Sequence, residues 1–269
     1  MKTWAAALAL WACSPVVSGA SSGAPGWDIA GLKLGMTEAQ VRAAFRAYDP
    51  KGKIIAGNAA IPYSDKVNSF RTPNFLSSME LRVTRRSIQT PLKVWFLGTG
   101  GEARVIAILR KELNVPDAPT AEQFLQSLTA KYGRPSATDG VNTPIWEESG
   151  KPSCIRVSHG EGAPKTINHN PFSSNLENRS DFAKAVAELE RWQQGGAGSA
   201  RAVYSGDLTR CGAFLYYYGT QNSPVNWFSG AMFDVGAIVA AQRERDAWVE
   251  RLETEAIRKR ESQAQAPKL

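Results

Sequence analysis

Apolar residues recur every three or four positions in several segments of this chain, which is the period of an amphipathic helix. The first segment opens with Thr37 and Gln40 at the spacing of a capping box. Residues 119–133 repeat the pattern, again with threonine and glutamine in the capping positions. Two further helices are expected, one over residues 181–193 and a much longer one over residues 235–262.

Other segments show the alternation or the short apolar runs that are typical of strands. Met79, Leu81 and Val83 alternate with polar residues, which predicts a strand with one buried face. Apolar runs at 92–97 and 103–109 flank a glycine-rich turn, which predicts an antiparallel hairpin. Further strands are expected around 145–146, 154–157, 202–208, 212–218 and 225–234, and irregular structure over 50–78.

These elements predict an α+β fold, in which helices pack on an antiparallel sheet and a long helix closes the chain. The two capped helices align Thr37 with Thr120 and Phe45 with Leu128, an offset of 83 residues. A duplicated helix-plus-strands unit and a chance agreement of two capped helices both stay open. The expected organisation is a signal peptide at 1–20, a first unit at 27–115, a second unit with an inserted loop and helix at 116–234, the long helix at 235–262 and a disordered tail at 263–269.

The first twenty residues have the composition of an export signal. Lys2 precedes an apolar run from Trp4 to Ala12, and small residues lead up to Ala20. We therefore expect cleavage after about Ala20, a periplasmic or secreted protein, and no transmembrane segment. Lipid anchoring through Cys13, which follows a degenerate lipobox, is the alternative.

Signal cleavage removes one cysteine and leaves Cys154 and Cys211. A pair of cysteines in an oxidising compartment predicts a disulfide, and two free buried thiols are the alternative. The formal net charge is +7, or +6 without Lys2, and the basic residues are spread along the chain apart from Arg82, Arg85, Arg86 and the C-terminal helix. A nucleic-acid partner is not expected, because such proteins concentrate their basic residues in a patch or stripe.

The chain offers few groups for catalysis. His159 and His169 are its two histidines, both in a polar loop, and there is no nucleophile-elbow or zinc-binding motif. Glu147 and Glu148 are adjacent on an expected strand, so they would point to opposite faces and could not flank one bond. No catalytic residue, metal or cofactor is expected, and a small-molecule ligand stays open. A hydrolase that uses a loop histidine is kept as an alternative.

Aromatic residues gather between residues 214 and 228. A core strand with aromatic side chains on both faces explains this cluster, and an exposed strip that recognises a partner is the alternative. On the second interpretation the candidate partner-binding residues are Tyr216, Tyr218 and Trp227, with Trp248 on the terminal helix.

The segment Leu32-x-Leu34-Gly35-Met36-Thr37-x-x-Gln40-Val41 resembles the opening signature of the SmpA/BamE-like outer-membrane-assembly lipoproteins. The glycine-x-proline and tryptophan that follow in that group are found here after the second helix, at 133–135 and Trp146. Similar paired helix-plus-sheet repeats are found in the secreted β-lactamase-inhibitor proteins. The resemblance implies a non-catalytic envelope protein that binds another envelope or secreted protein, with a secreted inhibitor of an extracellular hydrolase as the alternative.

Overall fold

The computed structural model of the protein describes residues 25–85, 88–97, 102–139, 143–159, 172, 182–195, 200–220 and 223–263. In chain order the elements are α1 (Glu38–Tyr48), β1 (Lys53–Ala59), β2 (Pro62–Ser64), β3 (Ser69–Arg71), β4 (Phe75–Arg85), β5 (Ile88–Leu97), β6 (Arg104–Leu113), α2 (Ala121–Tyr132), β7 (Ala137–Asp139), β8 (Thr143–Glu147), β9 (Val157–His159), α4 (Phe182–Gln193), β10 (Ala200–Ala202), the short 3-10 helix η1 (Leu208–Arg210), β11 (Ala213–Gly219), β12 (Trp227–Asp234) and α5 (Val235–Gln263).

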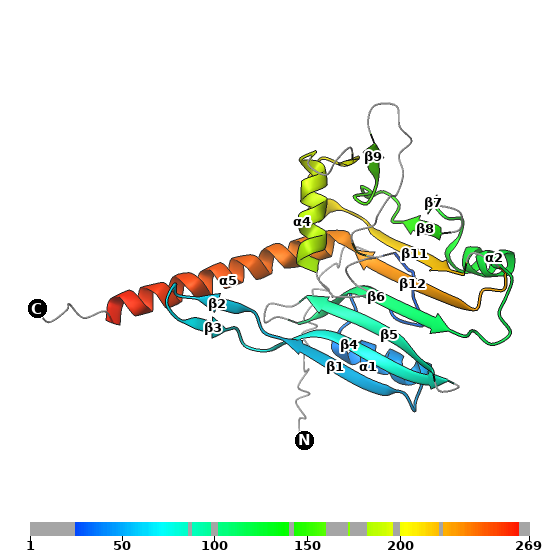
Figure 1. Cartoon of the computed structure of the whole chain (residues 1–269), viewed down its shortest axis with the longest axis horizontal. Coiled ribbons are helices and arrows are strands. Elements are labelled where there is room, and N and C mark those ends of the chain that lie inside the picture. Colours follow the sequence, from blue (N-terminus) through cyan, green and yellow to red (C-terminus); the bar gives the residue numbers. More distant parts are fainter. Residues whose placement is uncertain are drawn as a thin grey trace, which may run out of the picture.

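An antiparallel sheet of eight strands forms the middle of three layers, in the order β1-β4-β5-β6-β12-β11-β8-β7. Helices α1 and α2 cover one face, and α4 with the first turns of α5 covers the other (Figure 1). The α+β fold expected from the sequence, with helices on an antiparallel sheet and a long C-terminal helix, is confirmed.

The central strands are apolar on both sides because both faces of the sheet are covered. In β5, Val94 and Phe96 pack under α1 and α2, while Trp95 between them packs on the opposite face against Phe182 of α4. Met79 and its alternate neighbours in β4 form the buried face that their spacing predicts. The expected β5–β6 hairpin is confirmed, although its glycine turn at 98–101 lies outside the described residues.

Each half of the chain supplies one capped helix and four neighbouring strands of the sheet. Both capping boxes are formed, by Thr37 with Gln40 and by Thr120 with Gln123. The last strands of the two halves, β6 and β12, pair with each other at the centre. A duplication would give this order, but the duplication and the unit boundaries stay predictions.

Three of the sequence expectations about strands are wrong, in whole or in part. Residues 50–78 are not irregular, because they contain β1, the β2–β3 hairpin and the start of β4. Within the described residues, strand β1 pairs only with β4, and its register shifts between Gly57 and Asn58, which interrupts the alternation of its side chains. Residues 202–208 are not a strand, since β10 ends at Ala202 and η1 begins at Leu208. The strand expected at 154–157 begins only at Val157.

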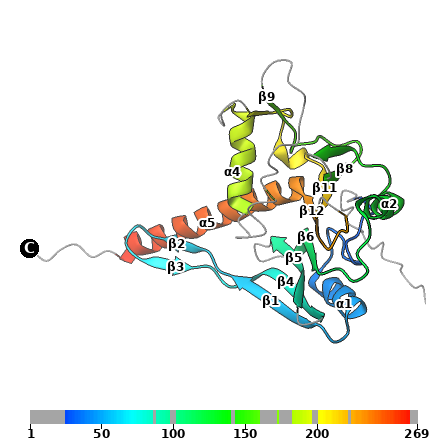
Figure 2. The same ribbon diagram turned by 45° about the vertical axis from the view of Figure 1, so that its right-hand side comes forward.

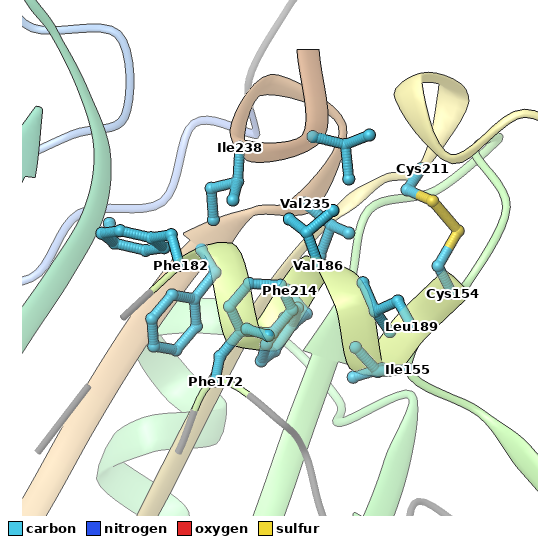
Figure 3. Packing of buried hydrophobic residues seen from close by; sticks show 14 of the residues in the cluster. Cys154, Ile155, Phe172, Phe182, Val186, Leu189, Cys211, Phe214, Val235 and Ile238 are labelled. Carbon is cyan, nitrogen blue, oxygen red and sulfur yellow. A yellow bond between two sulfur atoms is a disulfide. The ribbon is translucent and has the colours of Figure 1, made fainter. Parts of the chain in front are cut away.

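The disulfide between Cys154 and Cys211 is confirmed. It belongs to the larger hydrophobic cluster, in which α4 and the start of α5 pack against the sheet through residues such as Leu189, Phe214 and Val235 (Figure 3). The bond closes a loop of chain that carries β9, α4 and β10, so it ties this insertion back to the start of β11.

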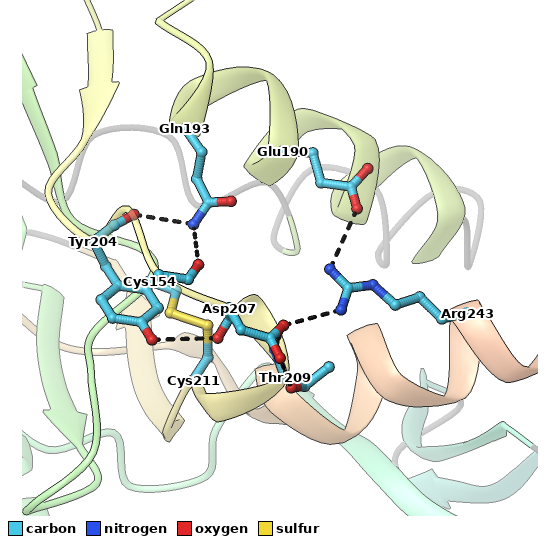
Figure 4. Close-up of polar contacts among 9 residues, drawn as sticks. Cys154, Glu190, Gln193, Tyr204, Asp207, Thr209, Cys211 and Arg243 are labelled. Carbon is cyan, nitrogen blue, oxygen red and sulfur yellow. Dashed lines mark hydrogen bonds and ion pairs between the residues drawn. A yellow bond between two sulfur atoms is a disulfide. The ribbon is translucent and has the colours of Figure 1, made fainter.

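Polar contacts connect η1 with helices α4 and α5 (Figure 4). Arg243 of α5 lies 2.9 Å from the carboxylate of Asp207 and 3.9 Å from that of Glu190 on α4. The Thr209 hydroxyl and backbone N–H donate to Asp207, and together with Arg243 they lower the pKa of Asp207 to about 2. Asp207 is therefore ionised at neutral pH, and Arg243 connects α5 with both η1 and α4.

Helix α5 has two different parts. Its first turns are buried between the sheet and α4, with Val235, Ile238 and Val239 at most 1% exposed. The rest leaves the sheet and runs beside β2 and β3 (Figures 1 and 2). We call β2, β3, their turn and residues 244–263 the arm. In the described part of the chain, no helix is long and apolar enough to cross a membrane.

Candidate functional site

A groove of about 770 Å³ lies beneath α2, next to the short edge strand β7. The helix forms one side, and the connection into β7 together with the ends of β8 and β11 forms the other. Its apolar lining consists of Ala121, Phe124, Leu125, Leu128, Pro135, Ala137, Pro144, Gly219 and Val225, and its polar lining of Glu122, Thr129, Arg134, Ser136, Thr138 and Thr220.

The groove exists because α2 has less sheet beneath it than α1. Strands β7 and β8 have 3 and 5 residues, whereas β4 and β5 have 11 and 10. Helix α1 buries Val41 and Phe45 completely, but α2 buries only Leu128, and Leu125 is 44% exposed. Apolar side chains of α2 therefore face a space that the strands do not fill.

The lining suits binding rather than acid–base chemistry. Its volume falls in the range of ligand sites, which are mostly apolar with a few polar groups. Among the described lining residues, only Glu122 and Arg134 carry titratable side chains, and both are exposed at the rim. An apolar segment could be buried in the groove, while its ends meet opposite charges.

Phe124 connects the groove to a polar network on the same face of the sheet. Its ring lies 5.1 Å from that of Phe228 and 6.2 Å from that of Tyr217. The hydroxyls of Tyr217 and Tyr132 are 2.9 Å apart, and Tyr132 donates to the backbone oxygen of Asp28. Burial raises the pKa of Tyr217, so its hydroxyl stays protonated and acts as a structural hydrogen-bonding group.

An ion pair lies in this network beside Tyr48, which ends α1. Arg110 is 2.9 Å from Glu112, and the Tyr48 hydroxyl donates to the same carboxylate at 3.1 Å. The guanidinium also lies over the ring of Phe228, 5.3 Å from its centre. Since each charge has a partner inside the protein, we assign the pair a structural role.

Replacing Glu112 with alanine is expected to lower the free energy of unfolding by about 2–3 kcal/mol, because Arg110 would be left largely buried without its partner. The double variant Arg110→Met/Glu112→Leu is expected to be more stable than the single variant, since it removes both charges together. Urea unfolding of the wild type and both variants measures this. A double variant less stable than Glu112→Ala would contradict the structural role of the pair.

The structure does not gather the four candidate partner-binding residues into one surface. Tyr216 is 4% exposed and belongs to the core on the α4 and α5 face. Tyr218 is half-buried next in the same stack, and Trp227 meets it edge to face at 5.7 Å. Trp248 instead packs against Phe75, where the arm begins. A role of these residues in partner binding stays a prediction.

The structure gives separate partners to the two glutamates considered from the sequence, and it does not describe the side chains of the two histidines. Glu147 pairs with Arg156, whereas Glu148 accepts the Ala213 N–H at 2.9 Å. The side chain of His159 and all of His169 lie outside the described residues. Within the described ranges, no group of three or more histidine, cysteine or acidic residues could hold a metal ion.

The groove was not predicted from the sequence. Its one signal was that Phe124, Leu125 and Leu128 give α2 a wider apolar face than a helix needs on a single sheet. Comparison with protein-family models, with curated proteins and with solved structures gave no match for this chain. The resemblance at residues 32–41 therefore stays an interpretation of the sequence, and the case for a function depends on the geometry of the groove.

Proposed function

We propose that this protein is an exported, non-catalytic binding module of the bacterial cell envelope, which holds an apolar segment of a partner protein in the groove beneath α2. The groove of about 770 Å³ beside an edge strand is the observation that carries the proposal. Leu125, which is 44% exposed at that groove, is the side chain that a partner would cover.

An extended peptide suits the groove better than a compact ligand. Within the described residues β7 pairs with β8 only, so its outer edge is open to another strand. Ala137 and Thr138 of β7 also line the groove. A peptide that adds to a strand edge gains backbone hydrogen bonds, and its alternate side chains can enter a neighbouring apolar pocket.

Export is supported by the Cys154–Cys211 disulfide, because such bonds persist in oxidising compartments and are rare in the cytosol. The signal segment and Cys13 lie outside the described residues. Cell fractionation of the full chain, with wild type compared with Cys13→Ser, separates a free periplasmic protein from a lipid-anchored one.

Replacing Leu125 with glutamate is expected to weaken peptide binding by ~tenfold or more, because a charge would be placed at the apolar lining. Gln126→Glu is the matched control, since residue 126 is exposed on the same helix but does not line the groove. Short peptides selected from a displayed random library on the wild type are the probes, and fluorescence anisotropy gives Kd. Both variants should keep the thermal stability of the wild type.

Equal affinity of the two variants would place the peptide elsewhere and overturn the proposal. The same two variants also test the alternative of a secreted hydrolase inhibitor. The arrangement of two helix-plus-four-strand halves in one sheet favours that alternative. Inhibition of an extracellular hydrolase from a panel, reduced by Leu125→Glu but not by Gln126→Glu, would identify the partner as an enzyme.

A further inference from the structure

The arm extends away from the three-layered body in both views of the molecule (Figures 1 and 2). A two-stranded hairpin is marginally stable alone, so the packing of β2 and β3 beside α5 matters for its order. Near the far end, Arg260 donates to the backbone oxygen of Asp65 at 2.6 Å. The end of the helix and the turn of the hairpin therefore form one tip.

The turn at this tip is firmly held. Asp65, 2% exposed, accepts hydrogen bonds from the backbone N–H groups of Val67 and Asn68 at 2.9 and 2.6 Å. The Asn68 bond is the main reason that the pKa of Asp65 is lowered. Ser64 also accepts from the N–H of Lys66, which has a positive φ of 74°. These hydrogen bonds fix the conformation of the turn, and in that conformation the Val67 side chain is exposed.

The turn and strand β3 after it each present an apolar side chain to solvent. Val67 is 72% exposed, and Phe70 is 38% exposed while its ring stacks on that of Tyr63 at 5.4 Å. The described part of the chain has five large hydrophobic residues with such exposure, and two of them lie within four positions here. A valine held out on a rigid turn has no role in packing the fold, so it is available to a partner.

Positive charge is concentrated at the same end of the arm. Four basic residues lie on the turn and on the end of the helix that contacts it, against two acidic ones; the basic residues are Lys66, Arg258, Lys259 and Arg260, and the acidic residues are Asp65 and Glu261. The preceding part of the helix, 244–255, has the opposite balance, with five acidic residues and two arginines. The arm is therefore acidic along its middle and basic where its apolar side chains are exposed.

We propose that the arm tip docks on an anionic lipid surface. Apolar side chains can enter the boundary between headgroups and acyl chains, while lysine and arginine side chains meet the phosphates. A specific protein interface buries roughly 800 Å² on each partner. Membrane contact needs only a few inserted side chains together with basic residues. The inference does not rest on the groove or its partner.

Charge reversal at the tip tests this proposal. Binding is measured by co-sedimentation with vesicles of phosphatidylcholine alone and with vesicles containing an equal share of phosphatidylglycerol. The wild type is expected to bind only the anionic vesicles, and less strongly as salt is raised. Lys66→Glu/Lys259→Glu is expected to weaken this binding on the order of tenfold or more. Lys51→Glu/Lys53→Glu, at the other end of β1, makes the same charge change and is the matched control.

Val67→Asp tests the apolar part, and since the side chain is 72% exposed, this variant should keep the thermal stability of the wild type. We expect it to weaken vesicle binding as well.

No binding to anionic vesicles, or an equal loss in the control pair, would overturn the proposal. Self-association of the wild type that is lost in the Lys66→Glu/Lys259→Glu variant would also overturn it. In that case the basic tip would bind the acidic middle of the arm, residues 244–255, in a second copy of the protein. Leu125→Glu should leave vesicle binding unchanged, so this result and the groove test can fail separately.

Discussion

Deletion of residues 235–269 is expected to unfold the protein, whereas deletion of residues 250–269 should leave the body folded. Val235, Ile238 and Val239 each contribute roughly 1.5–3 kcal/mol when fully buried, and a domain of this kind is stable by only about 5–15 kcal/mol. Gly236 also lies so close to η1 that a Cβ there would come within 2.6 Å of the Thr209 backbone oxygen. The first turns of α5 are therefore part of the core, although the arm is not.

Far-UV circular dichroism and thermal unfolding of the two truncated proteins measure this difference. The shorter deletion keeps Arg243 and its contacts with Asp207 and Glu190. It should unfold cooperatively near the wild-type midpoint, even though the β2–β3 hairpin loses its contact with Arg260. A chain that ends at Asp234 and still unfolds cooperatively would show that α5 is dispensable for the core. Binding experiments on the terminal helix should therefore use the shorter deletion.

Loss of the disulfide is expected to lower the free energy of unfolding by about 4 kcal/mol. Cys154 and Cys211 are 57 residues apart, and closing a loop of this length restricts the unfolded chain by about that much in the chain-entropy model. The closed loop carries β9, α4 and β10, so these elements should lose protection from hydrogen exchange before the central strands do. Guanidinium unfolding of Cys154→Ala/Cys211→Ala against the wild type gives the size of the effect.

A reduced wild-type sample is the control, because the alanine variant also removes two buried sulfur atoms. The reduced protein and the alanine variant should lose similar stability if the cross-link itself is the source. A loss below about 1 kcal/mol in both samples would mean that core packing alone holds the insertion in place.

The elements that local sequence determines were found without the structure. The capping boxes of α1 and α2 need residues three positions apart, and both helices begin where those boxes predict. The β5–β6 hairpin joins neighbours in sequence, and α4 follows its 3.6-residue pattern from Phe182 to Gln193. Pairing within such short distances depends on nearby side chains and costs little loop entropy.

The elements that were missed depend on distant partners. Strand β1 is held by β4 across the inserted hairpin, and neither β2 nor β3 has an apolar pattern long enough to identify it. The exposed turn with Val67 is ordered by Asp65 and by Arg260, which lies 195 residues further on. No local window of sequence contains that contact.

The candidate site shows the same division. The sequence pointed to aromatic residues of β11, and two of them, Tyr216 and Tyr217, are buried on opposite faces of the sheet. It did not point to the groove, because Leu125 is an ordinary apolar residue of a helix until the short strands β7 and β8 leave it uncovered. An unfilled space depends on the relative lengths of elements, which side-chain periodicity does not encode.

The sequence by itself determined the capped helices, the α+β class and the pairing of Cys154 with Cys211. The first two follow from local periodicity, and the pairing follows from the cysteine count once the expected signal peptide is set aside. Only the tertiary structure decided that β6 lies beside β12, that α5 begins in the core and ends in an arm, and that α2 overhangs a groove. These features arise where elements that are not neighbours along the chain bury each other's apolar surface, and that surface is defined only after the chain has folded.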